Sequence, residues 1–176
     1  MRLLAISGSL RAVSSNTSLL KAAQLLAPPT LQIELYEGLA SLPHFNPDLD
    51  VEPLPPTVAA LRAKIAVADG LLISSPEYAR GVPGSLKNAL DWLVSGPEFP
   101  EKPVALFNAS DRSTNAQAAL RLTLQTMSGR MVDEATITVR LLGKTSSVQE
   151  LADDPEISGI IRSALQAFMN AVTPRI

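Results

Sequence analysis

The chain has no cysteine and only one histidine in its 176 residues. Without cysteine it can form no disulfide, no thiolate nucleophile and no zinc–thiolate site. A single histidine also excludes a histidine-rich metal site, so we predict no bound metal. Any redox chemistry must therefore be carried by a bound cofactor rather than by side chains.

A strong charge imbalance and long apolar runs are missing as well. Lysine and arginine number 15 against 17 aspartate and glutamate, a net charge of -2, so we expect no nucleic-acid partner. No apolar run reaches the roughly 18 residues of a membrane-spanning helix. The first residues read as a strand rather than a secretory signal. We therefore expect a soluble, cytoplasmic protein with no membrane partner.

Aromatic residues make up only 4% of the chain, so leucine, valine, isoleucine and alanine must form most of the core. The hydrophobic fraction of 46% excludes global disorder. The length suffices for a sheet and its covering helices, and we predict a single domain over residues 1–176.

Short apolar runs alternate with longer helical patterns from one end of the chain to the other. Strands are predicted at Leu3–Ile6, Leu31–Tyr36, Gly70–Ser74, Val104–Asn108 and Ala135–Val139. Helices are predicted at Ser15–Leu26, Thr57–Ala68, Pro83–Val94, Asn115–Ser128 and Pro155–Val172. This alternation predicts an α/β fold: a flavodoxin-like, doubly wound, five-stranded parallel sheet of order 2-1-3-4-5 with helices on both faces. Such sheets bind ligands in the crevice between the carboxyl ends of strands one and three.

The loop after the first strand is rich in hydrogen-bond donors. It holds the hydroxyls of Ser9, Ser14 and Ser15, and it also carries Arg11 and Asn16. The following helix N-terminus adds free N–H groups and a favourable dipole, a set that suits a terminal phosphate. Neither a Walker loop nor a dinucleotide fingerprint is present, which favours a monophosphate. The alternative is an ordinary turn in which Asn16 or Ser15 only caps the helix.

The loop after the third strand holds an aromatic ring and a carboxylate in a turn. Pro76 and Gly81 stiffen and bend the chain, and Tyr78 offers a flat apolar face. A planar heterocycle could rest there and receive hydrogen bonds from the backbone N–H groups of the turn. Glu77 either pins the turn or reaches a partner subunit. The alternative is a surface turn in which Tyr78 covers the core.

Other segments carry weaker signals. Ser110, in the loop after the fourth strand, is expected to touch the far side of a ligand ring, although loop polarity explains it equally well. Residues 37–56 form a long proline-rich connection, of a length typical of functional or mobile loops. His44 in that connection has no identifiable catalytic partner, and Trp92 is expected to pack, within the chain or against another subunit.

Together these motifs resemble the NADPH-dependent FMN reductase family. The matching segments are Gly8-Ser9-Leu10-Arg11-x-x-Ser14-x-Asn16, Pro76-Glu77-Tyr78 and Pro83-Gly84-x-Leu86-Lys87-Asn88-Ala89-Leu90-Asp91-Trp92, and the similarity runs from residue 1 to about residue 140. The resemblance implies one non-covalent FMN, with its phosphate at the first loop and its isoalloxazine beside the second. It also implies a homodimer or homotetramer with the flavin near a subunit interface.

From the loops and the resemblance, the predicted cofactor-binding residues are Ser9, Arg11, Ser14, Ser15, Asn16, Pro76, Glu77, Tyr78, Ala79, Gly81 and Ser110. No catalytic side chain is predicted, because the cofactor carries the chemistry. Two features depart from the family pattern. Many members have asparagine where this chain has Ala79, and the loop at residues 108–113 is usually richer in glycine.

The resemblance implies an NAD(P)H-dependent oxidoreductase. NADPH or NADH would pass a hydride to FMN, and a small acceptor such as a quinone, free flavin, azo dye or chromate would take the electrons. The alternatives are a non-enzymatic FMN-binding electron carrier and a degenerate family member. A phospho-receiver domain would need acidic residues at the end of Leu3–Ile6, and a low-molecular-weight phosphatase would need a cysteine; neither is present.

Overall fold

The computed structural model describes residues 1–141 and 147–172. Within them, six strands form one parallel sheet of order β2-β1-β3-β4-β5, with β6 also pairing with β4. The strands are β1 (Arg2–Ser7), β2 (Gln32–Tyr36), β3 (Gly70–Ser74), β4 (Pro103–Asn108), β5 (Arg130–Met131) and β6 (Ile137–Thr138). The predicted order 2-1-3-4-5 is confirmed.

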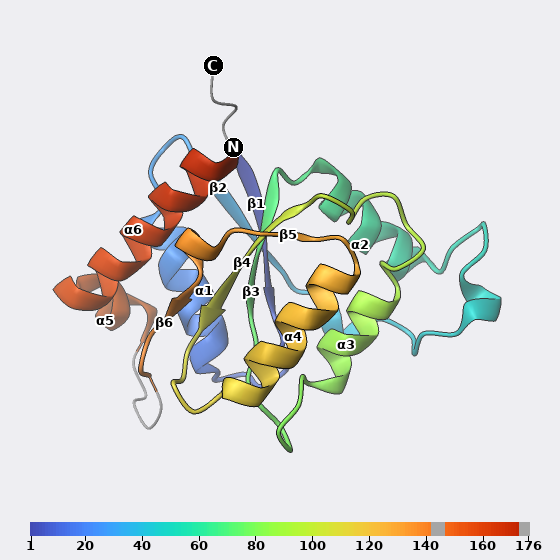
Figure 1. Ribbon diagram of the computed structural model, residues 1–176, viewed down its shortest axis with the longest axis horizontal. Coiled ribbons are helices and arrows are strands. Elements are labelled where there is room, and N and C mark those ends of the chain that lie inside the picture. The colour runs from blue at the N-terminus through green and yellow to red at the C-terminus, as the bar shows by residue number, and fades with distance from the viewer. Residues whose placement is uncertain (142–146, 173–176) are drawn as a thin grey trace.

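Helices cover both faces of the sheet (Figure 1). They are α1 (Ser15–Leu26), α2 (Pro56–Val67), α3 (Gly84–Asp91), α4 (Thr114–Thr126), α5 (Val148–Asp153) and α6 (Pro155–Val172). α1, α5 and α6 pack on one face, and α2, α3 and α4 pack on the other. Every residue of β3 and β4 is buried, as expected for parallel strands covered on both sides. No described helix is both long and apolar enough to cross a membrane.

The register of the sheet brings two predicted loops to the same level. β1 lies beside β3 with Ser7 paired to Ser74, the last residues of the two strands. The N–H of Gly8 continues this ladder by donating to the Ser74 carbonyl at 2.8 Å. The loops that follow β1 and β3 therefore leave the sheet side by side.

The fifth strand predicted at Ala135–Val139 is wrong in detail. Within that span the structure has only the short strand β6, while another short strand, β5, comes before it and is separated from it by a 3-10 turn, η3 (Asp133–Ala135). In the interruption the N–H of Leu106 donates to the Thr136 hydroxyl at 3.2 Å. The Thr136 hydroxyl thus takes the place of a backbone carbonyl in the ladder beside β4. The edge of the sheet is divided there into β5 and β6, so the structure has six strands instead of five. The short helix α5, which a capping box between Ser147 and Glu150 begins, is absent from the prediction.

The proline-rich connection at residues 37–56 is anchored to the body, although part of it extends outward in Figure 1. It contains two 3-10 turns, η1 (Leu39–Ser41) and η2 (Pro47–Leu49). Trp92 is fully buried within the chain; its ring meets Phe45 edge-on at 5.0 Å and its Nε1 donates to the Pro43 carbonyl at 2.8 Å. Arg62 of α2 pairs with Asp50 at 2.8 Å.

Candidate functional site

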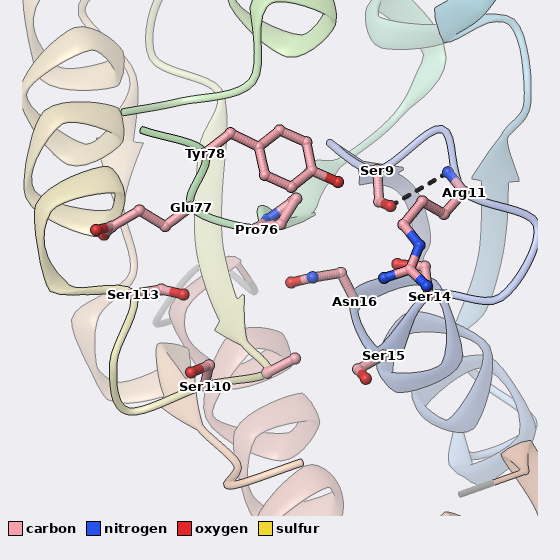
Figure 2. Close-up of a pocket in the computed structure, with 11 residues that line it drawn as sticks. Ser9, Arg11, Ser14, Ser15, Asn16, Pro76, Glu77, Tyr78, Ser110 and Ser113 are labelled. Carbon is pink, nitrogen blue, oxygen red and sulfur yellow. Dashed lines mark hydrogen bonds between the residues drawn. The ribbon is translucent and has the colours of Figure 1, made fainter. Parts of the chain in front are cut away.

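A pocket of about 230 Å³ opens at the carboxyl ends of β1, β3 and β4 (Figure 2). Three loops line it, those that follow these strands. The lining residues are Ser9, Arg11, Ser14, Ser15, Asn16, Pro76, Glu77, Tyr78, Ala109, Ser110 and Ser113. Nine of the eleven residues predicted from the sequence are among them. The position matches the crevice where doubly wound sheets bind ligands.

Two predicted residues lie outside the pocket lining, and two lining residues were missed. Ala79 and Gly81 belong to the outer part of the second loop. Ser113 shares the polar third loop with Ser110, so the same signal could have found it. Ala109 has no polar group, and nothing in the sequence marks it.

Three serine hydroxyls of the pocket are held in the same way. The oxygen of Ser9 accepts from the N–H of Arg11 at 3.3 Å, and that of Ser110 accepts from the N–H of Arg112 at 3.1 Å. Ser14 is the N-cap of α1, and its oxygen accepts from a backbone N–H one turn on. None of these three hydroxyls donates to another group within residues 1–141 and 147–172, so each proton can turn toward a ligand.

Asn16 and Arg11 add further donors. The Oδ1 atom of Asn16 accepts from the Ser74 hydroxyl at 2.9 Å, so the amide NH₂ remains for the pocket. Arg11 lines the same pocket, and the ion pairs within the described residues leave its guanidinium without a carboxylate. With the N-terminus of α1 beside them, these groups favour an anion whose oxygens only accept hydrogen bonds.

Glu77 directs its charge toward α4 (Figure 2). Its carboxylate accepts from the N–H of Ala116 at 2.9 Å and from the side chain of Asn115 at 3.2 Å. The hydrogen bond from Ala116, aided by that from Asn115, lowers the pKa of Glu77. Two roles were considered for Glu77, and the structure shows the first. The Glu77 side chain fixes the second loop to the first residues of α4.

The tip of the second loop is a tight hairpin. The N–H of Tyr78 donates to Gly81 at 3.1 Å, and the N–H of Gly81 donates back at 2.9 Å. The two residues between them, Ala79 and Arg80, have positive φ values of 49° and 61°. Positive φ at both central positions defines a type I′ turn. Tyr78 remains 49% exposed, so it lines the pocket rather than covering the core.

The pocket therefore has two chemical halves. The first loop offers donors for an anion, whereas Pro76, Tyr78 and Ala109 offer apolar surface to a planar ring. FMN carries both a terminal phosphate and a planar ring, and the donor set fits it. A doubly wound parallel sheet with this site at its switch point defines a flavodoxin-like, nucleotide-binding protein.

Comparisons with known proteins give the family. The family model for NADPH-dependent FMN reductases matches residues 1–141. An NAD(P)H-dependent FMN reductase of Pseudomonas aeruginosa is 34% identical over 173 residues, covering 96% of this chain and 93% of that protein. An NADPH:quinone oxidoreductase of Arabidopsis thaliana is 46% identical over 113 residues, which cover 61% of this chain and 57% of that protein.

A solved structure agrees. The flavoenzyme NAD(P)H:(acceptor) oxidoreductase of Paracoccus denitrificans superposes with a TM-score of 0.81 at 27% identity, covering 96% of this chain and 97% of that one. The chain belongs to the NADPH-dependent FMN reductase family. It is an FMN-dependent oxidoreductase with NAD(P)H as electron donor, and the resemblance found in the sequence is confirmed.

Proposed function

We propose that the pocket at the ends of β1, β3 and β4 holds FMN. The single observation that carries this assignment is the donor set of the first loop. Ser9, Ser14 and Asn16 have hydrogen atoms available to donate, and Arg11 adds a positive charge without a carboxylate partner among the described residues. Ser15 completes this side of the pocket.

The flavin ring is assigned to the other half of the pocket. Pro76 and Tyr78 offer it apolar surface, and the Ser110 hydroxyl is free to donate to it. Glu77 keeps this loop against α4. Ala79 and Gly81 lie outside the pocket lining, and their contact with the ring, through the backbone of the hairpin, stays a prediction.

The redox chemistry is supplied by FMN when it is bound. The side chains of this chain bind and orient it, and none of them is required as an acid, base or nucleophile. A quinone is the acceptor class that we favour, since the relatives from Arabidopsis thaliana and Escherichia coli are named as quinone reductases. Free flavin, azo dyes and chromate are the other acceptors to test, and NADPH and NADH are both candidate donors.

We also propose that the protein is a homodimer or homotetramer whose second subunit completes the site. The pocket volume of about 230 Å³ lies below the roughly 300–1,000 Å³ of sites that enclose a whole ligand. Near it, Leu10 and Val13 are 56% and 68% exposed, an apolar surface that a partner could cover. Light scattering of the FMN-bound protein measures the oligomeric state.

The remaining assignments are coarser. We propose that residues 1–176 act as one FMN-binding domain. Nucleic acid is not among the proposed partners, because the net charge is -2. A cytoplasmic location suits a protein that draws on the nicotinamide nucleotides of the cell interior.

The test is a visible spectrum of the purified protein supplied with FMN, followed by NADPH or NADH without oxygen. We expect a flavin band that stays with the protein, bleaches on addition of the donor and returns when a quinone is added. A retained band that never bleaches would favour the electron carrier or the degenerate member. Absence of retained flavin at saturating FMN would overturn the assignment.

A further inference from the structure

Ser74 is a buried hydroxyl that no motif from the sequence singled out. It is the last residue of β3 and is wholly buried. Its Oγ donates to Asn16 Oδ1 at 2.9 Å, a contact between residues 58 positions apart in the sequence. Its carbonyl also accepts from the N–H of Gly8 at 2.8 Å. Ser74 is thereby held at both its backbone and its side chain, and Asn16 Oδ1 is the acceptor that the structure gives to its buried hydroxyl proton.

This contact decides which end of the Asn16 amide faces the pocket. An asparagine side chain has an acceptor end and a donor end of nearly the same shape. With Oδ1 taken by Ser74, the NH₂ group is left for a ligand. A half-turn of the amide would instead present an oxygen, which a phosphate would repel.

Asn16 is the one neutral group of the first-loop donors whose character depends on such a contact. The hydroxyls of Ser9 and Ser14, whose oxygens each accept a backbone N–H, can rotate to turn a proton toward an anion, whereas an amide group has one fixed donor end and one fixed acceptor end. Within the described part of the chain, the Asn16 side chain is held by the Ser74 hydroxyl and by no backbone group.

We propose that Ser74 is a positioning residue that locks Asn16 as a hydrogen-bond donor and so makes the pocket selective for the phosphate ester FMN over riboflavin. The proposal rests on the proposed binding of FMN at this pocket. Ser74 acts through Asn16 and does not itself line the pocket. Its effect is therefore confined to the phosphate end of the ligand.

The binding test uses Ser74→Ala, Asn16→Ala and the double variant, titrated with FMN and with riboflavin. Loss of one oriented hydrogen bond to a charged group predicts that Ser74→Ala raises the Kd for FMN about 5- to 10-fold. The Kd for riboflavin is expected to change less than about twofold, since riboflavin has no phosphate. In the Asn16→Ala background, Ser74→Ala is expected to add less than about twofold.

Ser75→Ala is the matched control. Ser75 is the next residue, is equally buried, and donates its hydroxyl to the Pro76 carbonyl at 3.0 Å, away from Asn16. We expect it to leave both Kd values unchanged. Equal weakening of FMN and riboflavin by Ser74→Ala would overturn the proposal, because it would show a general structural defect. Full additivity of the two substitutions would also overturn it.

A measurement on the FMN-free protein separates this proposal from the assignment of the cofactor. The side-chain NH₂ resonances of Asn16, identified by their loss in Asn16→Ala, are recorded by ¹⁵N-resolved NMR. We expect them to shift in Ser74→Ala and to stay in place in Ser75→Ala. Failure to shift would overturn the positioning role whatever the protein binds. A shift in a protein whose wild type retains no FMN would overturn the proposed function and the FMN selectivity, and would leave the Ser74–Asn16 contact standing.

Discussion

At the scale of single residues, Glu77 shows how the pocket accommodates a carboxylate beside the loop that we propose to bind an anion. Its charge is turned to the N-terminus of α4, where Ala116 and Asn115 donate to it. A helix N-terminus stabilises a negative charge. Glu77 therefore links the second loop to the third and turns its charge away from the anion that we propose at the first loop.

Glu77→Gln is predicted to change how stability depends on pH. The hydrogen bonds lower the pKa of Glu77 from its ordinary value of 4.5 in the folded protein. A lowered folded pKa stabilises the protein above the unfolded pKa, and this contribution is lost as pH falls through the folded pKa. The variant should therefore be less stable than wild type at neutral pH, and the gap should close in acid. Thermal unfolding from pH 7 down to pH 3 measures it; a constant gap would contradict the prediction.

Ala79 departs from the family pattern, and its place in the hairpin gives a physical reason for the asparagine of other members. Ala79 has a φ of 49° and lies outside the pocket lining. Asparagine tolerates the left-handed region better than alanine does. The departure therefore bears on the turn more than on a flavin contact of the side chain.

Ala79→Asn is predicted to stabilise the protein by about 0.5 kcal/mol, and Ala79→Val to destabilise it by about 1 kcal/mol, since a β-branched residue is poorly accommodated at positive φ. Urea unfolding of the two variants and wild type gives the free energies. Equal stability of the asparagine and valine variants would show that the turn is not under this constraint.

At the scale of elements, α3 acts as the anchor of the connection at residues 37–56. The Oδ1 atom of Asn88 accepts from the N–H of Phe45 at 2.7 Å, and its amide donates to the Pro43 carbonyl at 2.9 Å. Trp92, one turn further, donates to the same carbonyl. The asparagine and tryptophan of the motif thus have structural partners within this chain.

Asn88→Ala is predicted to lower the free energy of unfolding by about 2 kcal/mol, because two hydrogen bonds are lost and the N–H of Phe45 is left without its acceptor. Protease cleavage between residues 43 and 55 should become faster. Lys87→Ala on the same helix is the control, since its pair with Asp91 is exposed and contributes little. Equal loss in both variants would contradict an anchoring role.

At the scale of the whole molecule, α6 packs on the sheet at Gly70, a residue without a side chain. A Cβ atom at Gly70 would lie 2.5 Å from the Phe168 ring and 2.9 Å from the Pro103 carbonyl. Phe168 is itself fully buried. Gly70 therefore permits the last helix to approach the central strand.

Two glycine substitutions should have opposite effects. Gly70→Ala is predicted to destabilise the protein by about 2 kcal/mol through overpacking against Phe168. Gly159→Ala, on the exposed side of α6 with no atom within 4 Å of the added Cβ, should stabilise it by up to about 1 kcal/mol. Chemical denaturation of both variants tests the pair, and a stabilising Gly70→Ala would show that α6 does not depend on this close approach.

The sequence predicts the fold where local signals are strong. α1 and α6 match their predicted bounds, since Ser14 caps the first and Pro155 begins the second. The split of the last strand follows from a tertiary contact, the Thr136 hydroxyl taking the N–H of Leu106, which no periodicity reveals. α5 spans six residues, too few for a helical pattern to stand out.

For the site, the sequence identifies which loops form the pocket, but it does not identify the individual side-chain contacts within it. Polar residue types and the order of the strands suffice to gather nine predicted residues around one pocket. The hydrogen bond of Ser74 to Asn16 depends on the register between β1 and β3, and Ala109 enters the lining through its position alone. Register and backbone path are set by packing of the whole chain, so neither could be predicted from the motifs.

The pocket lining runs from Ser9 to Ser113 and includes parts of three loops. No short stretch of the unfolded chain can reproduce it, so a ligand that fills it binds the native state and ignores the denatured one. Such a ligand stabilises the folded protein. At a free concentration of 100 times its Kd, it raises the free energy of unfolding by about 2.7 kcal/mol. If FMN binds here as proposed, the stability of the folded protein would depend on the concentration of FMN around it.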